Sequence, residues 1–268
     1  MSVALVLPGG ANFGAIQVGM LKALARAGVQ PDLLVGTSIG AVNATYLGLH
    51  GGLAGLPGLE QIWLGTTRRV TFPIRPDVMA LGLANRGRGM VPGSAPRRFM
   101  TSIYGTRNLE DASPRVAVVT TDATTGEDVL LTSGPATPAV VASTAMPGIF
   151  PPVRIGGRWL CDGSVSADMG VLQAESLGAT VIYVLSTRPP TTGREPPNGA
   201  FAMVMRAASL LEDRLNDHVL AEVGARRDVR VIPAAELGVD LLPYDFRRTA
   251  QLIALGEVTA TAWLGSAA

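Results

Sequence analysis

Short apolar runs alternate with segments of helical periodicity at the start of the chain. Residues 3–7 are apolar throughout and end in Pro8-Gly9-Gly10, the pattern of a strand that is buried on both faces. Apolar residues recur at helical spacing from Ala15 to Ala27, and a second apolar run, Leu33–Val35, precedes another helical segment. The order strand, glycine loop, helix, strand, helix predicts a parallel sheet covered by helices.

The rest of the chain continues this alternation, apart from residues 50–110. Strands are predicted at 116–121, 129–131, 153–155, 158–160, 181–185 and 229–232, and helices at 138–145, 170–177, 201–223 and 246–263. The helix at 201–223 has the apolar stripe of an amphipathic helix, formed by Val204, Ala208, Leu211, Leu215 and Val219. Residues 50–110 are rich in Gly, Pro and Arg and weakly periodic, so we expect short helices and loops over one end of the sheet. The predicted fold class is α/β, a three-layer α/β/α sandwich with a mainly parallel central sheet, built by residues 1–268 as a single domain with an insertion at about 50–110.

Composition narrows the class of protein. Of the 268 residues, 47% are hydrophobic and 16% are charged, as in globular chains, and the net charge of +1 argues against nucleic acid as the main partner. The single cysteine, Cys161, excludes an internal disulfide and a cysteine-based metal cluster, and we expect no metal and no cofactor. The N-terminus lacks the basic region of a secretory signal, and no run reaches the ~18–20 apolar residues that span a bilayer. We therefore expect a cytoplasmic protein with no transmembrane segment.

The pentapeptide Gly36-Thr37-Ser38-Ile39-Gly40 lies between the second predicted strand and its helix. It fits G-x-S-x-G, the nucleophile elbow, in which a tight turn holds a serine hydroxyl at the end of a sheet. Small residues are needed there because the strand and helix backbones pass close together. In a chain with 32 glycines the same pattern is also compatible with a simple tight turn, so the surrounding residues decide between the two.

The glycine-rich loop "PGGANFG" at 8–14 follows the first predicted strand. In a parallel sheet this loop neighbours the elbow, so its backbone N–H groups are placed to face a developing oxyanion. The candidate donors are the N–H groups of Gly9, Gly10, Ala11 and Ile39. Nucleotide binding is the competing interpretation, but the spacing matches neither G-x-G-x-x-G nor G-x-x-x-x-G-K-[ST], and Lys22 lies too far along the helix to reach a phosphate.

A serine nucleophile needs a base, and the chain has three candidates. His50 follows the elbow helix, and His218 lies near the edge of the apolar stripe at 201–223; neither has a motif around it. Asp162, in "LCDGSVSADMG", comes directly after an apolar strand, where strand ends deliver catalytic groups. An aspartate at this place is also typical of an Asx turn, so the residues alone leave both roles open.

Ordered motifs along the chain resemble those of the patatin-like phospholipases. They are the glycine-rich loop in "LPGGANFGAIQVGML", the elbow in "GTSIGAVNA", the segment "ASTAMPGIFPPV" and the "DGS" at 162–164, and "TTDATTGE" at 120–127 is similar to the family's strand and turn. The resemblance covers nearly the whole chain. It implies a patatin-like fold, a Ser38–Asp162 dyad without a histidine, and hydrolysis of fatty acyl esters in phospholipids or related lipids.

The glycine-rich loop departs from the family pattern G-G-G-x-[RK]-G at two positions. Ala11 stands in place of the third glycine, and Phe13 in place of the basic residue. Backbone donors survive a glycine-to-alanine change where φ is negative, so we expect a negative φ at Ala11 and an intact oxyanion hole. We expect Phe13 to pack against apolar neighbours and to leave the shape of the loop unchanged.

Two alternatives to the dyad hydrolase remain. The chain order Ser38, Asp162, His218 suits a triad esterase of the α/β-hydrolase kind, although an elbow at position 38 leaves few preceding strands. The non-enzymatic alternative is a lipid- or partner-binding module that keeps the fold while the altered loop has lost catalysis.

The insertion is strongly basic. Eight arginines and one acidic residue lie between Thr66 and Asn108, in a chain whose net charge is +1. The arginines are Arg68, Arg69, Arg75, Arg86, Arg88, Arg97, Arg98 and Arg107. Two interpretations are open: a solvated loop, or a surface that makes peripheral contact with an anionic membrane, with arginines on phosphates and the interspersed apolar side chains in the acyl boundary.

Overall fold

The structure, a computed structural model, describes residues 1–73, 75–84, 87–167, 169–188, 198–234 and 244–266. An eight-stranded sheet lies at its centre in the order β5-β6-β3-β2-β1-β7-β8, with β4 paired to β3. The strands are β1 (Val3–Leu7), β2 (Leu33–Thr37), β3 (Arg115–Asp122), β4 (Asp128–Leu131), β5 (Val153–Ile155), β6 (Arg158–Asp162), β7 (Val181–Leu185) and β8 (Asp228–Ile232). The five strands from β8 to β3 run parallel, and β4, β5 and β6 pair antiparallel, which confirms the predicted mainly parallel sheet.

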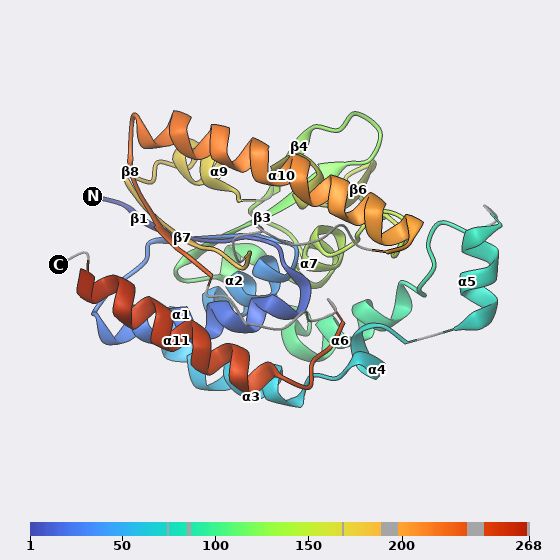
Figure 1. The fold of residues 1–268 in the computed structure, drawn as a ribbon, viewed down its shortest axis with the longest axis horizontal. Coiled ribbons are helices and arrows are strands. Elements are labelled where there is room, and N and C mark those ends of the chain that lie inside the picture. The colour runs from blue at the N-terminus through green and yellow to red at the C-terminus, as the bar shows by residue number, and fades with distance from the viewer. Residues whose placement is uncertain (74, 85–86, 168, 189–197, 235–243, 267–268) are drawn as a thin grey trace.

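Helices cover both faces of the sheet (Figure 1). On one face lie α1 (Gly14–Arg26), α2 (Ile39–Leu49), α3 (Leu56–Gly65), α6 (Ser94–Tyr104), α7 (Ala136–Ser143) and α11 (Thr249–Ser266), and on the other lie α9 (Val171–Ser176) and α10 (Ala200–Gly224). Leu5 and Leu7 of β1 pack in the core of the first face, and Ala4 and Val6 in that of the second. Burial on both faces explains why β1 is apolar throughout and establishes the three-layer α/β/α architecture.

The segment at 50–110 forms short helices joined by loops. Besides α3 and α6 it forms α4 (Arg68–Thr71) and α5 (Pro76–Leu83). Trp63 of α3 and Tyr104 of α6 are 3% and 1% exposed and belong to the main core. In contrast α5 stands apart at the right of Figure 1, and its Leu83 is 70% exposed. The two ends of the segment, α3 and α6, therefore belong to one helical layer, while α5 in its middle extends away from the sheet.

The apolar stripe of α10 packs against the second core only at its C-terminal end, where Val219 contacts that core and Val223 is fully buried. Val204, Leu211 and Leu215 are 65%, 71% and 42% exposed. Polar side chains of the helix also contact the protein: Arg188, which follows β7, forms ion pairs with Glu212 and with Asp213 (3.1 Å). The sequence pattern identifies the apolar face of the helix correctly, but most of that face lies at the surface among the described residues.

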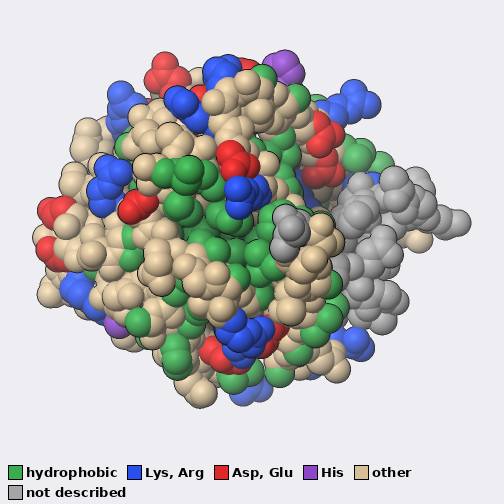
Figure 2. Space-filling view, turned by 90° about the vertical axis from the view of Figure 1, so that its left-hand side faces the viewer, with side chains coloured by type: hydrophobic (Ala, Val, Ile, Leu, Met, Phe, Trp, Pro, Cys, Tyr) green, Lys and Arg blue, Asp and Glu red, His purple; other side chains and the backbone are tan. Residues whose placement is uncertain are grey.

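The sheet ends at β8, which is an edge strand. Figure 2 views this end of the molecule, the left-hand side of Figure 1, and hydrophobic side chains gather there in a band across the middle with charged side chains around it. Among the described helices, none combines the length and the apolar character needed to cross a bilayer.

Candidate active site

Ser38 lies at the sharp turn from β2 into α2. Its φ of 53° and ψ of −122° fall in a region that L residues rarely adopt, at a cost on the order of 1–3 kcal/mol. A Cβ at Gly40 would lie 1.8 Å from the Leu7 carbonyl oxygen, and one at Gly36 would lie 2.5 Å from the Cα of Ala41. Both glycines of the pentapeptide are therefore required by close backbone approach, as in a nucleophile elbow.

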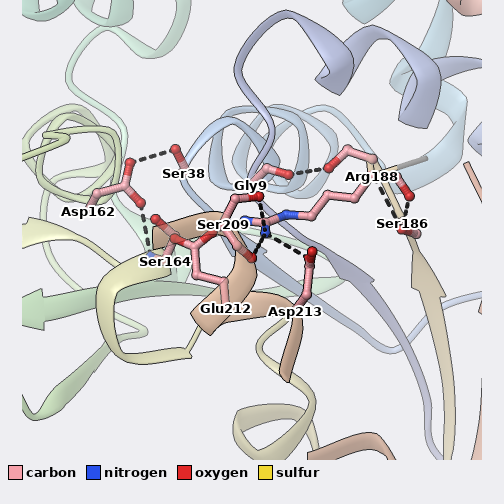
Figure 3. A network of polar contacts seen from close by, with 10 residues as sticks. Gly9, Ser38, Asp162, Ser164, Ser186, Arg188, Ser209, Glu212 and Asp213 are labelled. Carbon is pink, nitrogen blue, oxygen red and sulfur yellow. Dashed lines mark hydrogen bonds and ion pairs between the residues drawn. The ribbon is translucent and has the colours of Figure 1, made fainter. Parts of the chain in front are cut away.

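The Ser38 hydroxyl contacts a buried carboxylate (Figure 3). Its Oγ donates a 2.7 Å hydrogen bond to Asp162 Oδ2, and Asp162, at the end of β6, is 1% exposed. The other oxygen, Oδ1, accepts a hydrogen bond from the backbone N–H of Ser164 at 3.0 Å. One carboxylate oxygen is thus fixed by the backbone while the other faces the serine.

The backbone of Ser38 is held by a residue for which the sequence predicted no role. The Ser38 N–H donates to Ser143 Oγ at 2.9 Å, and that hydroxyl donates to the Val119 carbonyl at 2.6 Å. Ser143 ends α7, within the segment "ASTAMPGIFPPV". Because the Ser38 amide is occupied, the first free amide of the elbow is that of Ile39.

Neither histidine is hydrogen-bonded to the serine or to the aspartate. Nδ1 of His50 lies 2.7 Å from the Tyr46 carbonyl, and its Nε2 lies 3.0 Å from a guanidinium nitrogen of Arg107. A guanidinium can only donate, so Nε2 accepts and Nδ1–H donates to Tyr46, which is the arrangement of a neutral ring. His218 is exposed on α10, and no hydrogen bond of its side chain is present in the described part of the chain.

The candidate oxyanion donors divide into two groups. Ala11 and Ile39 line the same cleft as Ser38, and within the described ranges the amides of Gly10, Ala11 and Ile39 make no hydrogen bond. The Gly9 amide likewise makes no hydrogen bond in the described ranges, but Gly9 is not among the residues that line the cleft, and its carbonyl accepts a hydrogen bond from Thr187. Ala11 has a φ of 51°, so the expectation of a negative φ is wrong. The loop imposes this conformation because Gly10, at φ 150°, turns the chain directly into the short helix Ala11–Phe13.

Two buried side chains support the glycine-rich loop from behind. Thr187, at the carboxyl end of β7 and 1% exposed, donates its hydroxyl to the Gly9 carbonyl, and a Cβ at Gly10 would lie 2.4 Å from its Oγ1. Gln17 of α1 donates to the Pro8 carbonyl at 2.9 Å. Sequence reasoning missed both, although each carries a signal: a polar residue after a buried strand and a polar residue inside an apolar helix. Phe13 packs against the main core, as expected from the sequence.

A buried network of polar side chains connects Gln17 to Trp63, which lines the cleft. Asn43 of α2 donates to Gln17 Oε1 at 2.9 Å and accepts a hydrogen bond from Trp63 Nε1 at 2.8 Å. All three side chains are almost fully buried and mutually satisfied. The network fixes α1, α2 and α3 relative to one another beneath Ser38.

The cleft above Ser38 is apolar and has a volume of about 90 Å³. Its hydrophobic lining comprises Ala11, Ile39, Val42, Ile62, Trp63, Phe72, Pro96, Phe99, Met100, Met146, Phe150 and Phe246, and its polar lining Ser38, Asp162, Thr66, Thr71 and Thr144. Asp162 is therefore the single carboxylate among the described residues of the lining. The cleft suits an elongated apolar group that ends at a hydroxyl nucleophile.

The Cys161 thiol, next to Asp162 in sequence, is not a competing nucleophile, and the described residues form no metal site. Burial raises the pKa of the Cys161 thiol, and the carboxylates of Asp162 and Asp122 raise it further, so the thiol stays protonated near neutral pH. Groups of three or more His, Cys, Asp or Glu side chains that would hold a metal ion do not occur in the described ranges. The chemistry at the cleft is that of a hydroxyl and a carboxylate.

An elbow serine hydrogen-bonded to a buried aspartate, in a three-layer α/β/α fold, is an arrangement typical of serine acyl hydrolases. The family model described as "Patatin-like phospholipase" matches residues 5–175, and the chain belongs to this family.

Relatives and solved structures agree with this assignment. The chain is 28% identical over 230 residues to "Lysophospholipase NTE1" of Pyricularia oryzae, a match that covers 84% of this chain and 15% of that protein. It is 28% identical over 193 residues to "Patatin-like phospholipase domain-containing protein 7" of Rattus norvegicus, covering 69% of this chain and 13% of the relative. VipD from Legionella pneumophila shares the fold, with a TM-score of 0.53 at 16% identity over 99% of this chain and 67% of VipD. The family and the relatives' names support an enzyme of the lipid acyl hydrolase class, while the chain spans only a small part of each relative.

Proposed function

We propose that this chain hydrolyses fatty acyl esters of phospholipids or related lipids, with Ser38 as nucleophile and Asp162 as general base. The observation that carries the proposal is the 2.7 Å hydrogen bond from Ser38 Oγ to Asp162 Oδ2 inside an apolar cleft. The names of the relatives favour a lysophospholipid, which has one acyl chain, as the first substrate to test.

The reaction proceeds in two halves. Asp162 Oδ2 accepts the Ser38 proton as Oγ attacks the acyl carbonyl carbon, and the resulting oxyanion is stabilised by the amides of Ile39 and of the loop at Gly10 and Ala11. Collapse breaks the ester C–O bond, and the leaving alcohol takes the proton from Asp162. A water molecule, deprotonated by Asp162, then attacks the acyl-serine, which releases the fatty acid and returns the proton to Ser38.

An aspartate with its ordinary pKa of about 3.9 is a weak base toward a serine hydroxyl. One feature of the cleft offsets this weakness. The positive end of the α2 dipole lies at Ser38 and favours the negative charge that develops during attack. We expect a modest rate of catalysis from a dyad of this kind.

The acyl chain occupies the apolar cleft in this proposal. Burial of each methylene group contributes about 0.8 kcal/mol, so kcat/KM should rise with chain length until the cleft is filled.

Because Ala11 and Phe13 depart from the family pattern, the alternative is a binding module that keeps the fold but has no catalytic activity. A serine-reactive fluorophosphonate probe distinguishes the hydrolase from the binding module. If the chain is a hydrolase, the probe labels Ser38 of the native protein and does not label the Ser38→Ala variant. The native protein, but not the variant, then also releases fatty acid from a lysophospholipid. A native protein that binds lipid but neither reacts with the probe nor releases fatty acid is the binding module.

We also propose that the insertion, through its basic part between Thr66 and Asn108, makes peripheral contact with anionic membranes. Arg69 and Arg98 are exposed and free of ion pairs within the described residues, and Leu81 and Leu83 of α5 are 50% and 70% exposed. Not all eight arginines belong to this surface. Arg107 is tied to the Leu49 carbonyl at 2.9 Å and to His50, and Arg75 is paired with Asp77 at 2.8 Å; Arg86 lies outside the described residues.

A further inference from the structure

A second cavity adjoins the catalytic cleft and has a volume of about 400 Å³. The two cavities share part of their walls, namely Pro96, Thr144 and Phe150. Thr144 directly follows Ser143, whose hydroxyl accepts the hydrogen bond from the Ser38 amide. The second cavity therefore lies beside the part of the catalytic cleft that Thr144 lines.

Two arginines and a tryptophan line the second cavity. Arg97 comes from α6, and Arg154 comes from β5, where it is paired directly across the hairpin with Trp159 of β6. The guanidinium carbon of Arg154 lies 5.9 Å from the centre of the Trp159 ring, and that of Arg88 lies 4.3 Å from the same ring. Stacking on an aromatic face restricts a guanidinium without using its N–H donors.

The charges of these arginines are unneutralised in the described part of the chain. The lining of the cavity contains no carboxylate, and none of Arg88, Arg97 and Arg154 forms an ion pair with a described residue. Several other surface arginines differ in this respect, since Arg75, Arg226, Arg230 and Arg247 are each paired with an acid. The second cavity therefore presents a concentration of positive charge beside an apolar cleft.

We propose that the second cavity is a head-group subsite that binds a phosphate-bearing alcohol portion of the ester substrate through Arg97 and Arg154, with Arg88 adding charge at Trp159. A guanidinium matches phosphate because its planar donors form two parallel hydrogen bonds. This inference rests on the proposed hydrolase function and adds the residues that bind the head group, so that an acyl ester with an anionic phosphate head group is cleaved in preference to a neutral acyl ester.

The direct test compares two substrates with the same acyl chain, lysophosphatidic acid and monoacylglycerol, each diluted in neutral detergent micelles so that the surface carries little charge. The native protein should prefer the phosphate-bearing lipid by kcat/KM. Arg97→Gln and Arg154→Gln should each lower that preference about tenfold, because each removes a charged hydrogen bond to phosphate. Arg158→Gln is the matched control: Arg158 is 55% exposed in the same hairpin but does not line the cavity, and its variant should keep the native preference.

Equal turnover of both lipids by the native protein, or an unchanged preference in Arg97→Gln and Arg154→Gln, overturns the subsite. The same holds if Arg158→Gln loses as much preference as they do, because the effect is then one of general charge. Inorganic phosphate should compete weakly, since it lacks the acyl anchor. If inorganic phosphate saturates the protein at low concentration without any preference between the two lipids, the cavity is a free-phosphate site.

A binding measurement keeps the subsite separate from the proposed catalysis. In the Ser38→Ala background, the same micelles should bind more tightly when they carry lysophosphatidic acid than when they carry monoacylglycerol, and adding Arg154→Gln should remove most of that difference. If the native protein hydrolyses neither lipid while this binding difference is present, the hydrolase proposal fails and the phosphate site stands. If the binding difference is absent, the subsite fails whether or not the lipids are hydrolysed.

Discussion

The hydroxyl of Thr187 donates a hydrogen bond to the carbonyl oxygen of Gly9, across the junction between the end of β7 and the glycine-rich loop. A peptide unit whose carbonyl is held on one side presents the next N–H on the other, so this bond orients the Gly10 amide toward the cleft. In the proposed mechanism Thr187 is thus a positioning residue for the oxyanion donors, one step removed from the reacting atoms.

Replacing Thr187 by valine keeps the shape of the side chain and removes its hydrogen bond. We expect Thr187→Val to lower kcat about tenfold with little change in KM, because the loss acts on the oxyanion in the transition state and not on binding of the acyl chain. Thr187→Ser, which keeps the hydroxyl, should recover most of the activity. A general loss of packing would instead lower the melting temperature of both variants and raise KM, which is the outcome that contradicts a positioning role.

Most of the fold follows from the sequence because buried parallel strands are apolar without interruption. β1 and β7 are predicted at 3–7 and 181–185, where the structure has them. Ser38 and Asp162 were identifiable for a related reason, since both stand where an apolar strand ends. The environment of α10 was not predictable in the same way. A helical pattern shows which face is apolar, but not that only the C-terminal end of this face packs on the core, at Val219 and Val223, while polar side chains nearer its start contact Arg188.

Single polar residues without a motif account for the parts of the site that the sequence did not reveal. Thr187 and Ser143 act through backbone groups of the loop and the elbow, and their partners are known only once the strands are placed side by side. The backbone of Ala11 is a similar case. Alanine normally avoids a positive φ, so the sequence argued for the conformation that the loop does not adopt.

The positive φ of Ala11 predicts a stabilising substitution. An L residue in this region costs about 1–2 kcal/mol, part of which is offset by the larger entropy of an unfolded glycine. We expect Ala11→Gly to raise the free energy of unfolding by about 0.5–1 kcal/mol, measured by urea denaturation. Ala15→Gly, inside α1, serves as the contrast and should lower it by about 1 kcal/mol or more. A destabilised Ala11→Gly would show that the backbone at this position is not strained.

The membrane proposal predicts a steep dependence on salt. Between about 0.01 M and about 1 M salt the Debye length falls from about 30 Å to about 3 Å, so exposed arginines lose their attraction to anionic lipid. Binding to vesicles with anionic lipid should weaken over this range, and neutral vesicles should bind poorly throughout. The double variant Arg69→Glu/Arg98→Glu should bind anionic vesicles weakly even at low salt. Arg115→Glu, at the opposite end of the sheet, should bind like the native protein; equal, salt-independent binding to both vesicle types contradicts the proposal.

The central claim is that Asp162, and not a histidine, is the base for Ser38. It rests on the 2.7 Å hydrogen bond between these two residues and on the placement of His50 against Tyr46 and Arg107. The most direct measurement is the rate of fatty acid release from a lysophospholipid by Asp162→Asn beside His218→Ala, with folding of each checked by circular dichroism. The dyad predicts that Asp162→Asn is nearly inactive and that His218→Ala retains substantial activity. Loss of activity in a correctly folded His218→Ala, or retention of activity in Asp162→Asn, would contradict it.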